Sequence, residues 1–310
     1  MKAVYFERHG GPEVLIYGDV PDPSAGPGEV VVNIAASSVN GADWKVRAGN
    51  YYTETPLPHI LGRDFSGTVA AVGDGVPDLH VGDAVFGVLP PGQEGTYAEQ
   101  VAVAAAVIAR NPADMPHVDA AALALTGLTA MSAIEETIQL KRGETILIQG
   151  GSGGVAGVAI QLARHIGARV ITTTSAANIE YVRDLGADQV IDYHAEDFTS
   201  IGPVCDAVFD TVGGDVAQKS YTVLKPGGRA AFIASGRDAP PAARSDVQTL
   251  RPPATRARAP LERLAQLYQA GAVRPPELRL FKLSDAAEAH RVSEGRHLRG
   301  KLIFQIRDAR

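Results

Sequence analysis

The sequence has few of the features typical of proteins in an oxidising compartment or a membrane. Its 310 residues include one cysteine, Cys205, which excludes an intramolecular disulfide framework and a four-cysteine zinc site. We find no run of the roughly 18 apolar residues that a membrane helix needs. Glu7 and Arg8 come before any run of signal-peptide length. We therefore expect a cytoplasmic protein with no membrane partner.

Positive charge is also scarce. The chain carries 29 Lys and Arg against 35 Asp and Glu, a net charge of −6, and the two signs are interspersed. Binding along a nucleic-acid backbone needs a sustained basic stripe. We therefore expect no nucleic-acid partner. With 45% hydrophobic residues, a chain of this length can form two ordinary cores, so two domains are expected.

The first part of the chain, up to about residue 120, has the pattern of short strands. Glycine and proline separate alternating or β-branched runs such as KAVYF, EVVVNIAAS, GTVAAVG, DAVFGVL and YAEQVAV. Such runs predict strands and hairpins. We expect a compact, antiparallel, barrel-like domain here.

From about residue 121 the pattern changes to helices alternating with apolar strands. The strand-like runs are ETILIQ, ARVITTT, DQVID, DAVFDTV and GRAAFIAS, with helical stretches between them. Strands that alternate with helices of this length indicate βαβ units and a parallel sheet. The second domain is therefore predicted to be doubly wound α/β.

A glycine-rich stretch follows the first strand of that sheet. Gly151-Ser152-Gly153-Gly154-Val155-Ala156 fits the pattern G-x-G-x-x-G/A. In this pattern glycine permits the tight turn and the close approach of a pyrophosphate, which the N-terminus of the next helix then binds. The alternative is a turn that only packs. The strand before it and the helix after it, which Gly167 is placed to end, favour dinucleotide binding.

The end of the second strand bears on which dinucleotide binds. An acidic residue there would hold the ribose hydroxyls of NAD, but this chain has Thr172, Thr173, Thr174 and Ser175. NADP is therefore favoured, with Ser175, Asn178 and Tyr193 as further donors. No Arg or Lys lies in TTTSAANIEY to pair with a 2′-phosphate, and the threonines could reflect β propensity alone.

Motifs along nearly the whole chain resemble one family. They are GGPEVL, GPGEVVV, SSVNGADWKVRAG, LGRDFSGTVAAVGDGV, VGDAVFG, AAALALTGLTA, LIQGGSGGVAG, LGADQVIDY, DTVGG, LKPGGR and RGKLIF, in this order. Together they resemble the zinc-free quinone oxidoreductase (zeta-crystallin-like) branch of the medium-chain dehydrogenase/reductase superfamily. The resemblance is weakest between about residues 236 and 262.

This resemblance implies a division of the chain. A GroES-like β-barrel catalytic domain would span 1–120, completed by 276–310, and a Rossmann domain would span 121–275. The resemblance also implies an active cleft at their junction and a homodimer. The chain departs from the family in its glycine motif, usually A-x-x-G-G-V-G, and at Ala177, where a basic residue is often found.

The resemblance also bears on metal. Zinc-dependent relatives have a cysteine where this chain has Asn40, a His-Glu pair where it has Arg63 and Asp64, and a cysteine near Thr126. The remaining carboxylate alone suits zinc poorly, so no catalytic metal is expected. Without a Lewis acid, the substrate must be polarised by hydrogen bonds. That suits hydride addition to a quinone or an α,β-unsaturated carbonyl.

The candidate catalytic residues lie in SVNGADWKVRAGNYY. By resemblance, Asn40 would lie beside the nicotinamide, and Asp43, Lys45, Tyr51 and Tyr52 would line the substrate side. Tyr52 or Tyr51 could donate a hydrogen bond or a proton to the developing enolate oxygen. The alternatives are that Asn40 only caps the following helix and that the tyrosines are loop surface.

Nearby polar residues have structural interpretations. We expect Asp64 to be a turn acid with Arg63 as its partner, and His59 to be an ordinary loop residue. Cys205, at the start of a strand, is predicted to be a small buried thiol.

Other candidates complete the cofactor site. Ligands bind at the carboxyl ends of the strands in open α/β sheets, where the segments DTVGG and FIASG lie. The nicotinamide half is therefore predicted to contact Thr211, Val212, Ala234 and Ser235, with Thr126 approaching from the linking helix. Lys301 would close the cleft by resemblance alone.

Three functions remain open from the sequence. The first is an NADPH-dependent reductase of quinones or enones. The second is an enoyl-thioester reductase, for which the basic segment Arg251–Arg258 could bind a phosphopantetheine arm, although it reads more simply as a solvated loop. The third is an NADPH-binding protein without turnover, because a fold does not determine a function.

Overall fold

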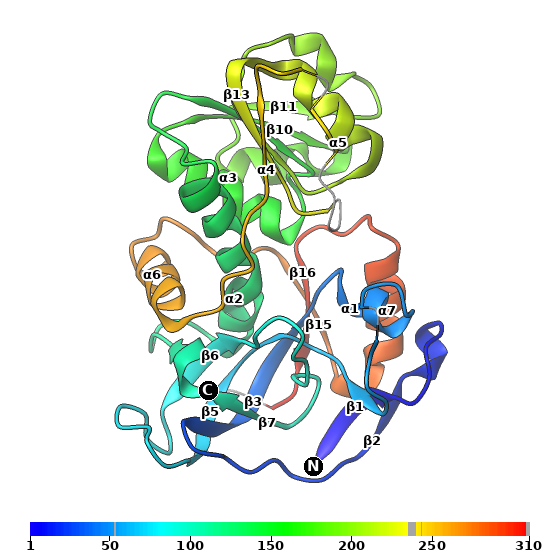
Figure 1. Ribbon diagram of the computed structural model, residues 1–310, viewed down its shortest axis with the longest axis vertical. Coiled ribbons are helices and arrows are strands. Elements are labelled where there is room, and N and C mark those ends of the chain that lie inside the picture. The colour runs from blue at the N-terminus through cyan, green and yellow to red at the C-terminus, as the bar shows by residue number, and fades with distance from the viewer. Residues whose placement is uncertain (53, 235–239, 243, 308–310) are drawn as a thin grey trace. The chain divides into compact units, whose positions relative to one another are not determined.

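The computed structural model describes residues 1–52, 54–234, 240–242 and 244–307. The chain forms two compact units (Figure 1). The first contains residues 1–125, 256–270 and 275–310, and the second contains 126–255 and 271–274. Residues 256–270, which the sequence division assigns to the nucleotide-binding domain, group with the first unit.

The first unit is built on β-sheets. The larger one has the order β15-β16-β3-β5-β6-β8, and β7 pairs with β3. Its strands are β3 (Glu29–Val39), β5 (Asp64–Val72), β6 (Ala84–Val88), β7 (Gln100–Ala104), β8 (Ile108–Arg110), β15 (Leu278–Phe281) and β16 (Lys301–Gln305). A smaller sheet has the order β2-β1-β4, with β1 (Lys2–Phe6), β2 (Ile16–Asp19) and β4 (His59–Ile60). All pairs are antiparallel except β15 with β16.

Alternation along β3 explains the core of this unit. Val30, Val32 and Ile34 project to the same face and are fully buried, as expected for a strand with period two. They pack with Phe65 and Val85 from neighbouring strands. The C-terminal strand β16 pairs with β3, with Leu302 opposite Val39. The C-terminal strands β15 and β16 therefore belong to the larger sheet of this unit.

Helices complete the first unit. They are the short α1 (Asp43–Arg47), α6 (Arg258–Gln269) and α7 (Ala286–Glu294), together with 3₁₀ turns η1 (Pro12–Val14), η2 (Ala105–Val107) and η7 (Leu283–Asp285). In α6 the apolar residues Leu261, Leu264 and Ala265 recur at helical spacing and are buried.

One long apolar helix contains the boundary between the two units, which falls after residue 125. It consists of α2 (His117–Met131) and the π-helical turn η3 (Ser132–Thr137). By length and composition its 21 residues could cross a membrane, so the expectation that no stretch reaches that length was wrong. However, 78% of its apolar window is buried inside the protein, as in the core helix of a globular fold.

The second unit is a parallel six-stranded sheet in the order β11-β10-β9-β12-β13-β14 (green to yellow in Figure 1). Its strands are β9 (Thr145–Gln149), β10 (Arg169–Thr174), β11 (Gln189–Asp192), β12 (Cys205–Asp210), β13 (Leu224–Phe232) and β14 (Gln248–Leu250). Its helices are α3 (Gly154–Ile166), α4 (Ile179–Leu185) and α5 (Gly214–Ser220), with 3₁₀ turns η4 (Ala176–Asn178), η5 (Phe198–Ile201) and η6 (Tyr221–Val223). The predicted doubly wound fold is confirmed.

Strand order in this sheet reverses between β9 and β12. From β9 the chain proceeds outward through β10 and β11, and then returns to the other side of β9 as β12. Open α/β sheets bind their ligands at the carboxyl edge of such a switch point. The turn from β9 to α3, which contains the glycine motif, lies there.

Steric contacts explain the glycines of this turn. Gly150 has φ 74°, which favours glycine. A Cβ on Gly151 would lie 2.3 Å from Thr172 Oγ1, so this residue must be glycine for β9 and β10 to pack. A Cβ on Gly153 would meet the nearest protein atom only at an ordinary 3.4 Å. The fold therefore does not require glycine at 153, whereas a closely bound phosphate would.

Candidate active site

Residues from two loops meet at the carboxyl edge of the second unit. A Cβ on Gly150 would lie 3.0 Å from Val212 Cγ2 and 3.1 Å from Thr211 Oγ1. The Thr211 hydroxyl donates to the carbonyl of Gln149 at 2.8 Å, which ties the loop after β12 to the end of β9. The structure therefore brings Thr211 and Val212 beside the glycine motif, and their contact with a nicotinamide stays a prediction.

The structure gives fewer contacts for the other residues predicted at this edge of the sheet. Ala234 contacts the same loop, because a Cβ on Gly213 would lie 3.3 Å from its Cβ. Ser235 lies outside the described residues. Thr126 is on α2 and is only 2% exposed. Its predicted contact with a nicotinamide stays a prediction.

The N-terminus of α3 is open to an anionic ligand. Its N-cap, Gly153, provides no side-chain hydrogen bond to the first turn. The first N–H groups of a helix lack intrahelical partners, and the helix dipole places partial positive charge there. Ser152, Gly154 and Val155 are partly exposed beside this end. The turn therefore fits the pyrophosphate of a dinucleotide.

The end of β10 differs from the prediction in one respect. Thr172 and Thr173 hydroxyls donate to Ile148 O and Gln149 Oε1, each at 2.6 Å. Thr174 is only 1% exposed, and its hydroxyl has no hydrogen-bond partner among the described residues. In the described residues the Thr174 hydroxyl is therefore not at the surface. Its predicted contact with a 2′-phosphate stays a prediction.

Three other predicted donors do gather just beyond β10. Ser175 is partly exposed, and the Asn178 amide donates to its hydroxyl at 3.2 Å. The backbone N–H of Tyr193 donates to Thr174 O at 3.2 Å, and its side chain is 46% exposed. Ser175, Asn178 and the backbone of Tyr193 therefore form a polar rim at this end of β10. Their contact with a ribose 2′-substituent stays a prediction.

The first unit contains a buried polar network around Asn40. Its amide nitrogen donates to Asp64 Oδ1 at 2.9 Å and to Ser38 O at 3.3 Å. Lys301 Nζ donates to Asn40 Oδ1 at 2.5 Å and to Val39 O at 2.9 Å. Ser38 donates to the other oxygen of Asp64 at 2.7 Å.

This network corrects one interpretation of Asn40. Helix α1 has Ala42 as its N-cap, with no side-chain hydrogen bond, so Asn40 does not cap it. Instead its amide connects the ammonium of Lys301 to the carboxylate of Asp64. Lys301 is only 5% exposed. Burial lowers its pKa, and the Asp64 and Asp43 carboxylates partly oppose that shift.

Asp43 lies under the surface. It is fully buried and accepts hydrogen bonds from Tyr97 Oη at 2.7 Å and from the Asn40 N–H at 2.8 Å, both through Oδ2. Oδ1 has only an ion pair with Arg63 Nε at 3.5 Å. Burial raises the pKa of Asp43 to about 6, with Arg63 opposing the shift. Its side chain does not reach the surface of the described residues, and its predicted place on the substrate side stays a prediction.

Arg63 and Glu94 form the centre of a second cluster. Glu94 Oε1 accepts from Arg63 Nε at 2.9 Å and from Arg63 Nη2 at 2.6 Å. The Glu94 side chain is fully buried, and its Oε2 lies 2.8 Å from His59 Nε2. Burial opposes the charge on Arg63, but the Asp43 and Glu94 carboxylates outweigh it and raise the guanidinium pKa.

The two candidate tyrosines lie on this cluster. Arg63 Nη1 donates to Tyr51 Oη, and Nη2 donates to Tyr52 Oη, each at 3.3 Å. The guanidinium also lies 4.7 Å from the centre of the Tyr51 ring. The tyrosine rings meet edge to face, with their centroids 4.9 Å apart. Arg63 therefore joins these two phenols, whereas its expected partner Asp64 is bonded to Ser38 and Asn40.

Sequence reasoning missed Glu94 and Tyr97. Glu94 lies in a glycine-rich loop, and Tyr97 precedes a strand. Neither position has a motif that marks it, and each reaches its partner across more than 30 residues of sequence. His59, expected to be an ordinary loop residue, lies in β4 and contacts Glu94. Cys205 begins β12 fully buried, as predicted.

The donor set of this region does not fit zinc. Over the described ranges, no three His, Cys, Asp or Glu side chains converge as metal ligands would. Asn40 and Asp64 are already bonded to each other, and the Lys301 ammonium occupies the remaining face of the Asn40 amide. An amide, one carboxylate and a cation are poor ligands for a borderline-soft divalent metal.

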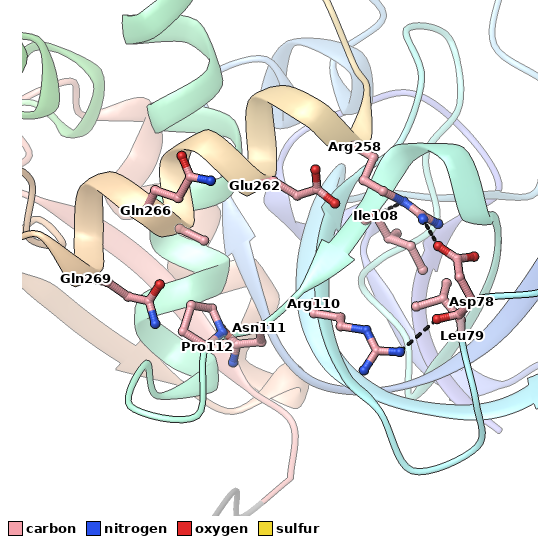
Figure 2. Close-up of a pocket in the computed structure, with 11 residues that line it drawn as sticks. Asp78, Leu79, Ile108, Arg110, Asn111, Pro112, Arg258, Glu262, Gln266 and Gln269 are labelled. Carbon is pink, nitrogen blue, oxygen red and sulfur yellow. Dashed lines mark hydrogen bonds and ion pairs between the residues drawn. The ribbon is translucent and has the colours of Figure 1, made fainter.

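A separate pocket of about 270 Å³ lies between α6 and β8 in the first unit (Figure 2). Its arginines are engaged by the protein. Arg258 bonds to Asp78 and donates to Ile108 O at 3.0 Å, and Arg110 donates to Asp78 O at 2.7 Å. Arg258 begins α6, so the segment Arg251–Arg258 is not wholly the solvated loop that was expected.

Comparison with known proteins is consistent with this geometry. The family "Alcohol dehydrogenase GroES-like domain" matches residues 26–113, and "Zinc-binding dehydrogenase" matches 185–304. A 2-methylene-furan-3-one reductase of Solanum lycopersicum is 35% identical over 78% of this chain, which spans 64% of that protein. An NADPH-dependent alkenal/one oxidoreductase of Arabidopsis thaliana is 32% identical over 98% of this chain and 79% of that protein. The solved quinone oxidoreductase of Coxiella burnetii is 36% identical over 99% of both chains, with a TM-score of 0.93.

We predict that Asp43 makes stability depend on pH. Its pKa is raised from 3.8 to about 6, so the folded protein binds this proton more tightly than the unfolded chain does. Ionisation of Asp43 therefore costs stability as the pH rises from 4 through 6. Asp43→Asn should remove this cost of about 3 kcal/mol, measured as urea unfolding free energy at pH 4 and pH 7.

The exposed Asp74→Asn is the matched control and should keep the wild-type pH dependence. The unfolding free energies of Asp43→Asn and of the wild type could instead change in parallel between pH 4 and pH 7. In that case ionisation of Asp43 does not destabilise the folded protein.

Proposed function

This chain belongs to the zinc-free quinone oxidoreductase branch of the medium-chain dehydrogenase/reductase superfamily, and we propose that it is an NADPH-dependent reductase of quinones or α,β-unsaturated carbonyls. The observation that carries the proposal is the pair of phenols held by the largely buried Arg63 guanidinium, with no donor set that fits zinc in the described part of the chain. The reductases of similar sequence act, by their names, on a methylene-furanone and on alkenals and alkenones.

The residues present suit a substrate that accepts hydride without a metal. When bound, the reduced nicotinamide supplies that hydride. Adding it to the β-carbon of an enone, or to a quinone, places negative charge on the carbonyl oxygen. A phenol hydroxyl that donates to this oxygen stabilises the charge more as it develops than in the ground state, which lowers the barrier.

NADPH is favoured over NADH by the rim beyond β10. Ser175, Asn178 and Tyr193 offer hydroxyl and amide donors there. Strand β10 itself ends without a carboxylate that would repel a 2′-phosphate, whereas Asp192 at the end of β11 lies opposite Thr174 and next to Tyr193. A basic partner for the phosphate is missing from this segment, so the discrimination depends on these neutral donors. The open N-terminus of α3 binds the pyrophosphate in either cofactor.

The two alternatives have less support. An enoyl-thioester reductase would use basic residues to bind a phosphopantetheine arm, but Arg258 is engaged by Asp78 and by backbone carbonyls. A binding protein without turnover would not need two phenols joined by one guanidinium. We further propose that the protein acts as a cytoplasmic homodimer on a small-molecule substrate. This rests on the family resemblance and on its single, buried thiol.

We predict that the protein reduces enones and quinones with NADPH faster than it reduces enoyl thioesters or oxidises simple alcohols. Because the residues present do not fit zinc, turnover should survive exhaustive chelation. The measurement is NADPH consumption over a panel of these substrate classes, with and without EDTA. Loss of activity on chelation, or turnover of alcohols alone, would contradict the proposal.

We predict that calorimetry will show tighter binding of NADPH than of NADH. Ser175→Asp should weaken NADPH by about 1–3 kcal/mol, because it places a negative charge beside the 2′-phosphate. Ser175→Asn is the matched control, of similar size and without charge, and should change the affinity much less. Equal weakening by both variants would show that the loss is steric rather than electrostatic.

A further inference from the structure

We propose, on the basis of the proposed function, that Arg63 anchored by Glu94 is a positioning residue that makes Tyr51 the proton donor and leaves Tyr52 in a supporting role. Arg63, Glu94 and both tyrosines belong to the first unit, so the argument needs only contacts within that unit. The residues adjacent in sequence, Tyr51 and Tyr52, are distinguished by their hydrogen bonds.

Glu94 holds the guanidinium in one orientation. Its buried Oε1 accepts from both Nε and Nη2 of Arg63. The planar fork of an arginine has its donors in fixed directions. With one side of the fork bound to Glu94, Nη1 is directed to Tyr51 and Nη2 also reaches Tyr52. A lysine could not make this set of contacts.

The two hydroxyl groups differ in whether a protein atom accepts their hydrogen. Tyr52 Oη accepts from Arg63 and donates to Glu94 Oε1 at 3.4 Å, so its hydrogen is directed into the protein. Tyr51 Oη accepts from Arg63, and no described contact takes its hydrogen. Tyr51 is also 44% exposed. The hydroxyl that can donate outward is therefore that of Tyr51.

The same arrangement stabilises Tyr51 after it has given up a proton. Once the β-carbon of an enone has received a hydride, the substrate is an enolate. The O–H bond of Tyr51 breaks, its proton passes to the enolate, and the electron pair stays on the phenol oxygen 3.3 Å from Arg63 Nη1. Water then returns a proton to Tyr51 because its side chain is open to solvent. Each turnover consumes one NADPH and one proton.

The first experiment compares enone turnover in two variants. Tyr51→Phe should lower kcat by about 10- to 1000-fold, because it removes the proton donor. Tyr52→Phe should lower it by less than about 10-fold. Tyr17→Phe, an exposed tyrosine on β2, is the control. A larger loss in Tyr52→Phe than in Tyr51→Phe overturns the proposal. If the wild-type protein reduces neither enones nor quinones, the proposed function fails as well.

The second experiment tests whether Glu94 anchors Arg63. It needs no cofactor and uses ultraviolet difference titration of the tyrosine phenols. Burial raises the pKa of Tyr52, Arg63 opposes that shift, and Glu94 adds to it. The Tyr52 ionisation, identified by its loss in Tyr52→Phe, should therefore move to higher pH in Arg63→Gln and to lower pH in Glu94→Gln. Shifts in the same direction, as general loosening of the structure would cause, overturn the proposed positioning.

A conservative variant separates charge from geometry. Arg63→Lys keeps the positive charge but not the fork, so the Tyr52 ionisation should stay closer to its wild-type pH than in Arg63→Gln. Enone kcat should nevertheless fall by about 10-fold or more, with the affinity for NADPH unchanged. Full enone activity in Arg63→Lys would contradict the positioning role. This variant also replaces Arg63→Gln if that protein does not fold.

Discussion

The pairing of Arg63 with the buried Glu94 carboxylate organises the cluster that carries the candidate catalytic tyrosines. A carboxylate with no solvent exposure is costly unless its charge is matched, and Glu94 meets this condition through two bonds from one guanidinium and a contact with His59. Once Arg63 is held in this way, its remaining donors point to Tyr51 and Tyr52. The loop that carries the tyrosines is thereby linked to the start of β5 and to the Glu94 loop.

The buried hydrogen-bond network around Asn40 differs from the pair of Arg63 and Glu94. Asn40 lies between an ammonium and a carboxylate. Its amide nitrogen donates to Asp64 and Ser38, and its amide oxygen accepts from Lys301. Such a network fixes the orientation of the amide and leaves it no free donor within the unit. The Asn40 amide is therefore rigidly held, whereas the Tyr51 and Tyr52 side chains are partly exposed.

The nucleotide-binding unit could be predicted well because its features are local. The glycine motif, the alternation of strands and helices, and the stop at Gly167, with φ 90°, all depend on residues close together in sequence. The burial of Thr174 was not predicted because it depends on the segments packed around β10. No pattern within TTTS could show this.

The clusters around Asn40 and Arg63 were predicted less well because their contacts are long-range. Asn40, Tyr51 and Tyr52 were named as candidates, but Glu94 and Tyr97 were not, since nothing in their segments signals a buried ion pair or a phenol that binds Asp43. Arg63 and Asp64 were paired because they are neighbours in sequence. Neighbours at the start of a strand point to opposite faces, and these two side chains have different partners for that reason.

The most direct test of the account follows the atoms of the reaction. With NADPH that carries deuterium at the transferred position of the nicotinamide, and an enone in ordinary water, the account predicts deuterium at the β-carbon of a saturated ketone. In deuterated water with unlabelled NADPH, it predicts deuterium at the α-carbon instead. Deuterium at the carbonyl carbon of an alcohol product, or no transfer of the label, would contradict the account.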